Sequence, residues 1–381
     1  MNQSDSTSST TTGTETDTGT APDRPEIRRI LERAVTRGGI PGILVEIRDG
    51  AESWHATAGV SDPATGRART PQDRFRIGSI TKTFVATVVL QLAAEGRIGL
   101  DDPLTDQLPL PEARFASGVS VRMLLDHTSG LPSHTDDPAA LNAHPTHPPE
   151  TLLRVAAARP PAFAPGTGWA YSNTNYVLAG LLVERVTGRT LAAEIDRRIR
   201  RPLGLVGTHL PAADEHGLPA PHARHHTKLF RTEPDAPVLD ATELDPAPFW
   251  ASGDMVSTAA DLNRFLAALL TGRLLPPARQ RELLTTVPTR DWLPGAAYGL
   301  GICTLPLPGG EGGATLRGMG GAVFGSWTYA FATPDGTRLL TVNTNGDWTA
   351  PDSGWSDPIG VFTDLLRAAF TRRRPGGTAA R

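Results

Sequence analysis

Four consecutive residues, Ser79-Ile80-Thr81-Lys82, place a hydroxyl group and an amine three positions apart. They stand where the loop 74–78 gives way to a long apolar run, so we expect a helix to begin here. Side chains three positions apart share one face of a helix, with their Cβ atoms about 5–6 Å apart. Ser79 Oγ and Lys82 Nζ could therefore meet. A serine at a helix N-terminus also keeps its backbone N–H free for a developing oxyanion.

Lysine is rare in this chain, and this rarity draws attention to Lys82. All of the 37 basic residues except Lys82 and Lys228 are arginine. An amine can lose its proton near neutral pH, whereas a guanidinium effectively cannot. Burial and the positive end of a helix would both disfavour a protonated Lys82 and suit it to act as a base. Because S-x-x-K is common by chance, the spacing taken alone is better explained by a capping Ser79 and a solvated Lys82. We expect Lys228 to be solvated.

A second cluster, Tyr171-Ser172-Asn173, follows a Pro/Gly loop and precedes the helical run 176–187. A phenol near a serine and an amine can relay a proton to a leaving group. An Asn amide can hold the carbonyl of an acyl substrate or the lysine. Without Ser79 and Lys82 the cluster would be read as a turn with a buried Tyr171.

Three spans of the sequence resemble one family, the class C β-lactamases and D-alanyl-D-alanine carboxypeptidases among the penicillin-recognising serine enzymes. The spans are Phe75 to Lys82, Leu124 to Leu131 and Tyr171 to Tyr176, in the order and at the spacing of the family. The similarity runs from about residue 28 to residue 370. Some enzymes on this scaffold are esterases, and others are transacylases or peptide cyclases in antibiotic assembly.

The resemblance implies a role for each matching residue. Ser79 would be the acylated nucleophile, Lys82 and Tyr171 its proton-transfer partners, and Asn173 a substrate-orienting amide. The segment 126–131 would be structural, with a structural His127 and with Gly130 capping the end of a helix. Trp250 matches a position near the cleft, where a substrate wall and plain packing are equally good interpretations.

The sequence departs from the family at the strand that edges the active site. The family places Lys or His there, then Thr or Ser, then Gly, and this chain has Met319, Gly320 and Gly321. In the family those side chains bind the free carboxylate of a D-alanine terminus or a β-lactam. A carboxylate buried without a cationic or hydroxyl partner is heavily penalised. The backbone N–H groups of Ser79 and Ala322, the oxyanion hole that the resemblance implies, do not depend on these side chains.

These observations predict an acylation site that no longer selects for a terminal carboxylate. We therefore expect a serine acyl-enzyme hydrolase or acyltransferase that acts on a small-molecule ester or amide without a free α-carboxylate. The acceptor of the acyl group would be water or an amine, and a role in antibiotic assembly would fit this chemistry. Two alternatives stay open: a D-Ala-D-Ala carboxypeptidase or β-lactamase with another carboxylate anchor, and a non-catalytic binding module. The intact set of Ser79, Lys82, Tyr171 and Asn173 speaks against an inactive protein.

Hydrophobic periodicity and turn residues predict the elements that must position these groups. Strands near both ends of the chain with helices between them predict an α/β (α+β) fold, an antiparallel sheet flanked by helices, with an inserted mainly helical domain. The expected domains are a tail at 1–25, a sheet domain at 26–80 and 295–370, a helical domain at 81–294 and a basic tail at 371–381. The expected helices are 26–37, 81–95, one beginning after Thr258, and 361–370, and the expected strands are 42–48, 52–59, 299–305, 327–333 and 338–343.

Composition narrows the class of protein further. A formal net charge of −3 gives no basic footprint for nucleic acid, and no apolar run approaches the length of a membrane span. The single Cys303 allows no intramolecular disulfide, and the first 25 residues lack the pattern of a secretory signal, so we expect a cytoplasmic protein without membrane attachment. We expect no cofactor. His222, His225 and His226 could share a helical face and bind a metal, but a polar surface loop is the better interpretation.

Overall fold

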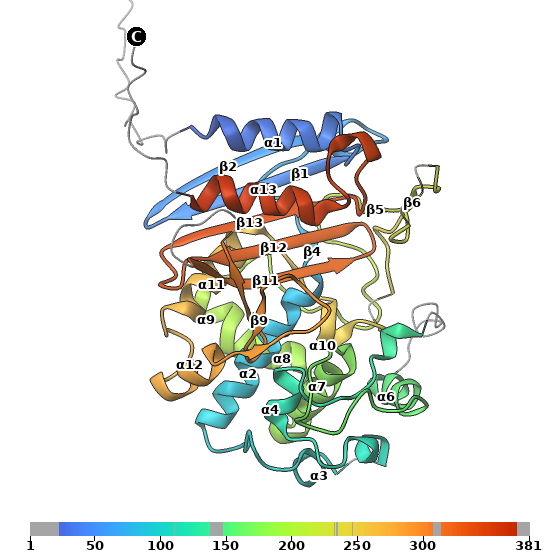
Figure 1. Cartoon of the computed structure of the whole chain (residues 1–381), viewed down its shortest axis with the longest axis vertical. Helices are drawn as coiled ribbons and strands as arrows, with labels where there is room; N and C mark the ends of the chain where they lie inside the picture. Colours follow the sequence, from blue (N-terminus) through green and yellow to red (C-terminus); the bar gives the residue numbers. More distant parts are fainter. Residues whose placement is uncertain are drawn as a thin grey trace, which may run out of the picture.

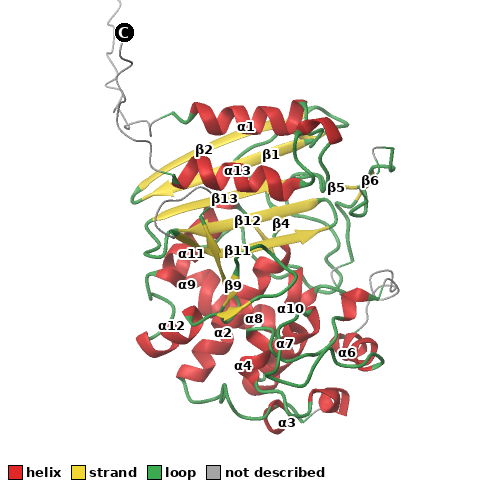
Figure 2. Ribbon diagram, in the orientation of Figure 1, coloured by secondary structure: helices red, strands yellow, loops and turns green. Residues whose placement is uncertain are grey.

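The computed structural model describes residues 23–371 apart from 110, 138–147, 232, 234, 246 and 308–313. The tails expected at 1–25 and 371–381 lie almost entirely outside the described residues. Figure 1 shows a sheet layer and a helical layer, and Figure 2 separates the two by colour. This architecture confirms the predicted fold class.

A nine-stranded antiparallel sheet, in the order β3-β2-β1-β13-β12-β11-β10-β9-β8, joins the two ends of the chain. The N-terminal and C-terminal parts of the sheet meet where β1 pairs with β13, with Val45 opposite Val342. The N-terminal strands and the C-terminal strands therefore depend on each other. The strands are β1 (Gly42–Asp49), β2 (Glu52–Asp62), β3 (Arg67–Ala68), β8 (Val287–Pro288), β9 (Ala297–Tyr298), β10 (Cys303–Pro306), β11 (Thr315–Val323), β12 (Ser326–Ala332) and β13 (Arg338–Thr344), with short pairs outside the sheet formed by β4 (Phe75–Arg76) with β7 (Val256–Ser257) and β5 (His226–Thr227) with β6 (Leu239–Asp240).

Helices cover both faces of the sheet. Helices α1 (Pro25–Thr36) and α13 (Pro358–Phe370) lie side by side on one face (Figure 1). Helix α11 (Ala259–Leu270) packs against β1, β12 and β13 on the other. Its Asn263 side chain donates a hydrogen bond to the backbone of β1 and accepts one from Thr341 of β13. A helix within the range expected for the inserted domain thus forms part of the sheet's own core.

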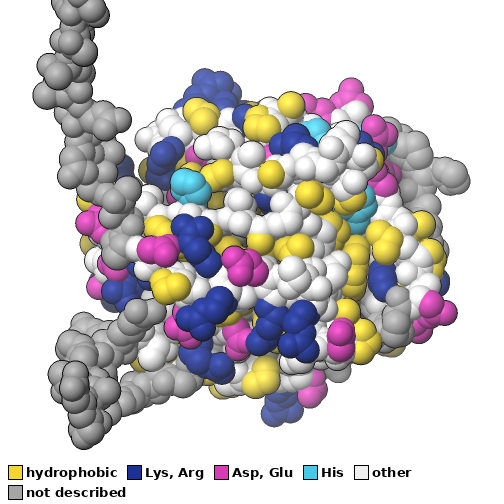
Figure 3. Space-filling model, turned by 90° about the horizontal axis from the view of Figure 1, so that it is seen from above, with side chains coloured by type: hydrophobic (Ala, Val, Ile, Leu, Met, Phe, Trp, Pro, Cys, Tyr) yellow, Lys and Arg dark blue, Asp and Glu magenta, His cyan; other side chains and the backbone are white. Residues whose placement is uncertain are grey.

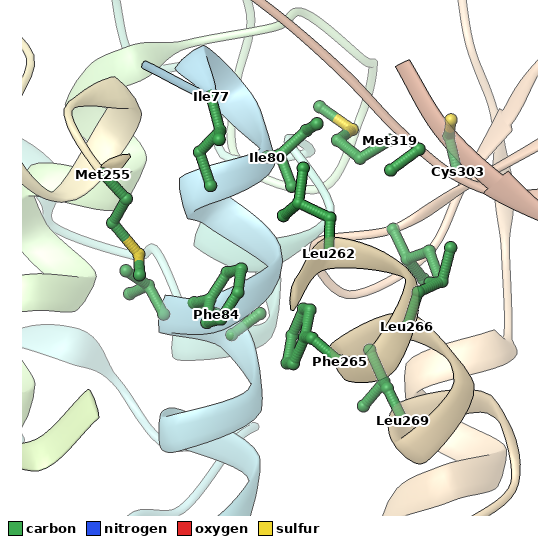
Figure 4. Packing of buried hydrophobic residues seen from close by; sticks show 14 of the residues in the cluster. Ile77, Ile80, Phe84, Met255, Leu262, Phe265, Leu266, Leu269, Cys303 and Met319 are labelled. Atoms are coloured by element: carbon green, nitrogen blue, oxygen red, sulfur yellow. The ribbon is translucent and has the colours of Figure 1, made fainter. Parts of the chain in front are cut away.

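Helix α2 (Thr81–Ala94) lies at the centre of the helical layer and is buried along nearly its whole length. Its Phe84 stacks on Phe265 of α11 with ring centroids 3.7 Å apart, and Figure 4 shows these rings between the two helices. Apolar packing therefore fixes α2 against the sheet-bound helix. The other helices are α3 (Leu104–Gln107), α4 (Val121–Leu125), α6 (Pro149–Ala157), α7 (Asn173–Thr187), α8 (Leu191–Ile195), α9 (Arg201–Leu203), α10 (Trp250–Gly253) and α12 (Pro277–Leu284), with single turns η1 (Gly78–Ile80), η2 (Pro111–Ala116), η3 (His134–Asp136), η4 (Asp196–Arg200) and η6 (Pro351–Ser353).

Most predicted elements are confirmed, and one strand is wrong. The range 299–305 is interrupted: β9 ends at Tyr298 and β10 begins at Cys303. Gly301 has a φ of +81°, and a Cβ atom there would lie 2.4 Å from the Cβ of Ala86 in α2. The backbone turns at this glycine because it crosses close to the buried helix. Helix α11 begins after Thr258 as expected, and the Thr258 side chain accepts a hydrogen bond from the Asp261 backbone N–H.

The surface carries mixed charge. On the face in Figure 3 basic and acidic side chains lie side by side. Where α1 meets α13, Arg33 and Arg367 both form ion pairs with Asp364. Among the described residues, none of the helices is both long and apolar enough to cross a membrane. The domain boundaries remain a prediction.

Candidate active site

Ser79 lies in the turn η1, which runs directly into α2. Its Oγ atom is 3.0 Å from Nζ of Lys82, in the first turn of that helix. Lys82 has no exposed surface, whereas Ser79 is partly exposed at a cleft of about 280 Å³. The contact predicted from the three-residue spacing is therefore confirmed.

The Lys82 amine contacts three oxygen atoms. Besides Ser79 Oγ, Nζ lies 2.7 Å from Oδ1 of Asn173 and 2.6 Å from the backbone oxygen of Ser252. Amide and carbonyl oxygens can only accept. A neutral amine would therefore use its two protons on Asn173 and Ser252 and direct its lone pair towards the Ser79 hydroxyl. Burial lowers the pKa of Lys82 well below its usual value of 10.5, which favours this neutral form.

The Tyr171 phenol is a second partner of the nucleophile. Burial raises the pKa of Tyr171 above its usual value of 10, and a hydrogen bond with Ser79 only partly opposes the shift. Nζ of Lys82 lies 4.8 Å from the centre of the Tyr171 ring. The phenol therefore keeps its proton at neutral pH, and the two partners of Ser79 differ in kind: a neutral amine that can accept a proton and a phenol that can donate one.

A hydrogen-bond network at the start of α7 fixes the orientation of Asn173. Its Nδ2 donates to Oγ1 of Thr135 at 2.8 Å, while its backbone N–H donates to Oγ of Ser133 at 3.1 Å. With Oδ1 bound to Lys82, one amide proton is left for a substrate. Sequence reasoning missed Ser133, Thr135 and Ser252. They come from two distant segments, the start of η3 and helix α10, and only their contact with Asn173 and Lys82 gives them a role.

Strand β11 and the turn η1 approach so closely that two glycines are required. A Cβ atom on Gly321 would lie 2.0 Å from the Ile77 oxygen and 2.7 Å from the Ser79 nitrogen. A Cβ atom on Gly78, whose φ is +53°, would lie 2.5 Å from the Ala322 nitrogen. The backbone nitrogens of Ser79 and Ala322 are thus neighbours in space, as the expected oxyanion hole requires.

The walls of this cleft are uncharged and largely aromatic. None of the described residues lining it is an acid, an arginine or a lysine. Phe324 pairs with Phe230 at 5.4 Å and with Phe249 at 6.1 Å between ring centroids. Sequence reasoning missed these three residues. The lining residues are Ser79, Thr135, Asn173, Phe230, Phe249, Ser252, Gly253, Ala322, Val323 and Phe324.

Four residues expected to bind substrate lie outside that lining. Met319 is 3 % exposed and packs in the hydrophobic core beside Ile80 and Cys303 (Figure 4). Gly320 and Gly321 contribute backbone only, and Gly321 serves the approach to Ser79. Trp250 lines a separate cavity of about 420 Å³. Because Met319 stands at the position of the family's basic residue, the cleft lacks that basic group. The substrate contacts expected of Gly320, Gly321 and Trp250 stay predictions.

The segment 126–131, which follows α4, has a structural role, but Gly130 fills it differently from the expectation. Helix α4 ends at Leu125, so Gly130 is not its cap, and that prediction was wrong. Gly130 has a φ of +73° and packs where a Cβ atom would lie 2.2 Å from the Phe163 oxygen. The His127 ring is fully buried 4.4 Å from the Tyr171 ring, and its Nδ1 accepts from the Ser172 backbone N–H. His127 therefore supports the turn that carries the phenol.

Two expectations about polar residues in the 222–228 segment were wrong. His225 is fully buried rather than part of a surface loop. Lys228 is 9 % exposed rather than solvated, and its Nζ lies 3.4 Å from the backbone oxygen of Glu233. Among the described residues, no group of three or more potential metal ligands converges here or elsewhere.

The site combines a serine in contact with a buried amine, a protonated phenol on the same serine and two adjacent backbone nitrogens. This arrangement defines the class of serine hydrolases that form an acyl-enzyme through an S-x-x-K pair. The comparison with known families agrees with this assignment. The beta-lactamase family model matches residues 27–354, and the chain belongs to that family.

Relatives of this chain include esterases and amidases. The esterase EstB of Burkholderia gladioli is 30 % identical over 351 residues, which cover 82 % of this chain and 88 % of the relative. A D-stereospecific amidohydrolase from Streptomyces sp. has 39 % identity and a TM-score of 0.80, covering 92 % of this chain and 99 % of its own. The D-amino acid amidase of Ochrobactrum anthropi SV3, in complex with L-phenylalanine amide, has 29 % identity and a TM-score of 0.77, covering 90 % of this chain and 96 % of its own. The chain is thus an enzyme, a serine hydrolase of the β-lactamase fold.

Proposed function

We propose that this enzyme forms an acyl-serine from esters or amides that carry no free carboxylate beside the scissile bond. One observation carries the proposal: the cleft at Ser79 has no charged lining residue among those described, and Met319 is buried where the family places a basic group. A carboxylate in such a cleft would lose its hydration without gaining a partner. An acyl group with aromatic or aliphatic substituents and no carboxylate suits the three phenylalanines.

The proposed chemistry follows from the protonation states of the two partners. The neutral Lys82 amine accepts the proton of the Ser79 hydroxyl, and the Oγ atom attacks the carbonyl carbon. The N–H groups of Ser79 and Ala322 stabilise the oxyanion. Tyr171 donates its proton to the leaving oxygen or nitrogen as the bond to the acyl carbon breaks, and Lys82 returns a proton to the phenolate. Water or an amine then releases the acyl group by the same steps in reverse.

The relatives support this substrate class. The Ochrobactrum amidase was crystallised with an amino acid amide, in which the carboxyl group is masked. The Streptomyces relative is a D-stereospecific amidohydrolase, and the Burkholderia relative is an esterase. Amides and esters of D-amino acids therefore belong to the proposed substrates. Transfer to an amine, a place in antibiotic assembly and a cytoplasmic location remain proposals that rest on the sequence.

The test is a comparison of neutral and carboxylate-bearing acyl donors. We expect turnover of p-nitrophenyl and methyl esters and of D-phenylalanine amide, with no cleavage of a D-alanyl-D-alanine peptide and no stoichiometric acylation by penicillin. Cleavage of that peptide while both esters survive would mean that another carboxylate anchor exists. Addition of an amine to the ester reaction separates the acceptors, because acyl transfer yields an amide product. A fluorophosphonate should label the wild type but not Ser79→Ala, and labelling of neither would favour a binding module.

The pH dependence of the reaction should follow the two shifted groups. The pKa of Lys82 is depressed, so the protonated, inactive amine disappears as pH rises through that value, and kcat/KM should rise with pH. The pKa of Tyr171 is raised, so the phenol keeps its proton beyond pH 10 and the plateau should extend into the alkaline range. A kcat/KM profile for a p-nitrophenyl ester checks both limbs. A rate that falls between pH 6 and 8 would contradict the proposed base.

A further inference from the structure

A second, larger cavity adjoins the reaction cleft. Its volume is about 510 Å³, and its walls include the rings of Phe230, Trp327 and Trp348. Phe230 also lines the reaction cleft, so the two hollows share a wall. A volume of this size accommodates an aromatic group with room to spare, since a cavity of about 150 Å³ binds benzene.

The second cavity begins close to the oxyanion hole. Trp327 of β12 lies directly opposite Ala322 of β11, and opposed residues in an antiparallel pair have Cα atoms about 4.5–5.5 Å apart. The Phe230 ring lies between the two hollows, 5.4 Å from the Phe324 ring and 6.0 Å from the Trp327 ring. A substrate of moderate length bound at Ser79 can therefore pass this ring and reach the second cavity.

The Phe230 wall is held in place by a carboxylate. Leu229 and Phe230 both have left-handed backbones, with φ of 55° and 59°, a conformation that is unfavourable for residues with a Cβ atom. The buried Asp347 accepts hydrogen bonds from the Thr227 hydroxyl, from the Lys228 backbone N–H at 2.9 Å and from the Gly325 N–H at 3.1 Å. One side chain thus fixes both the loop that carries Phe230 and the turn that follows Phe324.

The second cavity is lined by charges of both signs, so it favours neither an anionic nor a cationic ligand. Asp347 is committed to the loop, and Asp357 accepts the first backbone N–H groups of α13. The Lys228 ammonium lies 5.7 Å from the centre of the Trp348 ring. Arg231 and Glu233, which also line the cavity, have opposite charges.

The positions of the proton donor and the aromatic walls decide which end of the substrate enters. The leaving group must lie within reach of Tyr171, whose ring packs against His127, Trp292 and Tyr298. The rings of Phe230, Phe249 and Phe324 form a separate cluster, and none of these three rings packs against Tyr171. The side of the cleft that leads to the second cavity is therefore the acyl side.

We propose that the second cavity is a subsite for the remote end of the acyl group, and that it takes an aromatic or other apolar group attached through a chain of several atoms. This inference rests on the proposed function and narrows its substrates. It gives the strained Phe230 segment and its Asp347 anchor a role in substrate selection. The near part of the acyl group would lie in the reaction cleft, its remote end in the second cavity, and Phe230 between them.

The experiment compares two esters with the same leaving group, p-nitrophenyl acetate and p-nitrophenyl 6-phenylhexanoate. We expect the wild type to prefer the longer ester at least tenfold in kcat/KM. Trp348→Ala should lower that preference about tenfold, Trp348→Phe should retain most of it, and Trp54→Ala, on β2 away from the cavity, should leave the ratio unchanged. An unchanged ratio in a folded Trp348→Ala protein would overturn the subsite. Failure of the wild type to hydrolyse even the acetate would instead count against the proposed function.

A binding measurement tests the subsite without turnover. Calorimetry with 6-phenylhexanamide and the Ser79→Ala protein should detect binding that weakens about tenfold when Trp348→Ala is added. Absence of binding, or equal affinity in the two proteins, would overturn the proposal even if ester hydrolysis is observed.

Discussion

Replacement of Lys82 by arginine is expected to abolish turnover, because it places a fixed positive charge where the site uses a neutral amine. The site requires an amine that gives two protons to Asn173 and Ser252 and turns a lone pair to Ser79. A guanidinium has no accessible lone pair and does not lose its proton in proteins. Loss of a general base typically lowers the rate by 10²–10⁴-fold. We expect kcat for a p-nitrophenyl ester to fall by about 10³-fold or more.

A second variant separates charge from fit. Lys82 has no exposed surface, so arginine also overpacks the site, whereas Lys82→Met roughly preserves the volume. We expect Lys82→Met to be folded, as judged by its thermal unfolding, and equally inactive. If Lys82→Arg keeps more than a tenth of the wild-type rate, the residue acts through its charge and the proposed base is wrong. Ser79→Ala sets the rate of a protein without a nucleophile.

The chemical core of the site could be predicted from the sequence because it depends on short spacings. Ser79 and Lys82 meet through the pitch of one helix turn, and Tyr171 and Asn173 follow from a motif of adjacent residues. The walls could not be predicted in this way. Phe230, Phe249 and Phe324 are brought together by three loops, and their types alone are typical of any core.

The errors in the fold have a similar cause. Periodicity finds α13 because its apolar face repeats within a few residues, and α2 is recognised because its apolar run is long enough for a buried helix. The break at Gly301 depends on the passage of a distant helix, and the conformation of Gly130 depends on Phe163, more than thirty residues away. Lys228 is buried by contacts in its own loop and with Trp348. None of these contacts leaves a local pattern in the sequence.

Replacement of Gly321 by alanine is expected to disable the oxyanion hole while the fold survives. The added Cβ would lie 2.0 Å from the Ile77 oxygen and 2.7 Å from the Ser79 nitrogen, and both are backbone atoms that no side-chain rotation can move aside. Strand β11 and the turn η1 must separate, which carries the Ala322 N–H away from the oxyanion. Loss of one such donor typically lowers kcat by about 10²–10³-fold. We expect that loss with a modest change in KM, measured with a p-nitrophenyl ester.

The matched control is Gly217→Ala, because Gly217 is exposed and a Cβ atom there would meet nothing within 4 Å. Its activity and thermal unfolding should equal those of the wild type. Fluorophosphonate labelling adds a second readout for Gly321→Ala. Phosphonylation of Ser79, with loss of fluoride, should be slowed because the phosphonyl oxygen uses the same two N–H groups, while Lys82 remains in place to activate the serine. A Gly321→Ala protein with wild-type kcat would show that the close approach of β11 to η1 is a packing feature and that the oxyanion is stabilised elsewhere.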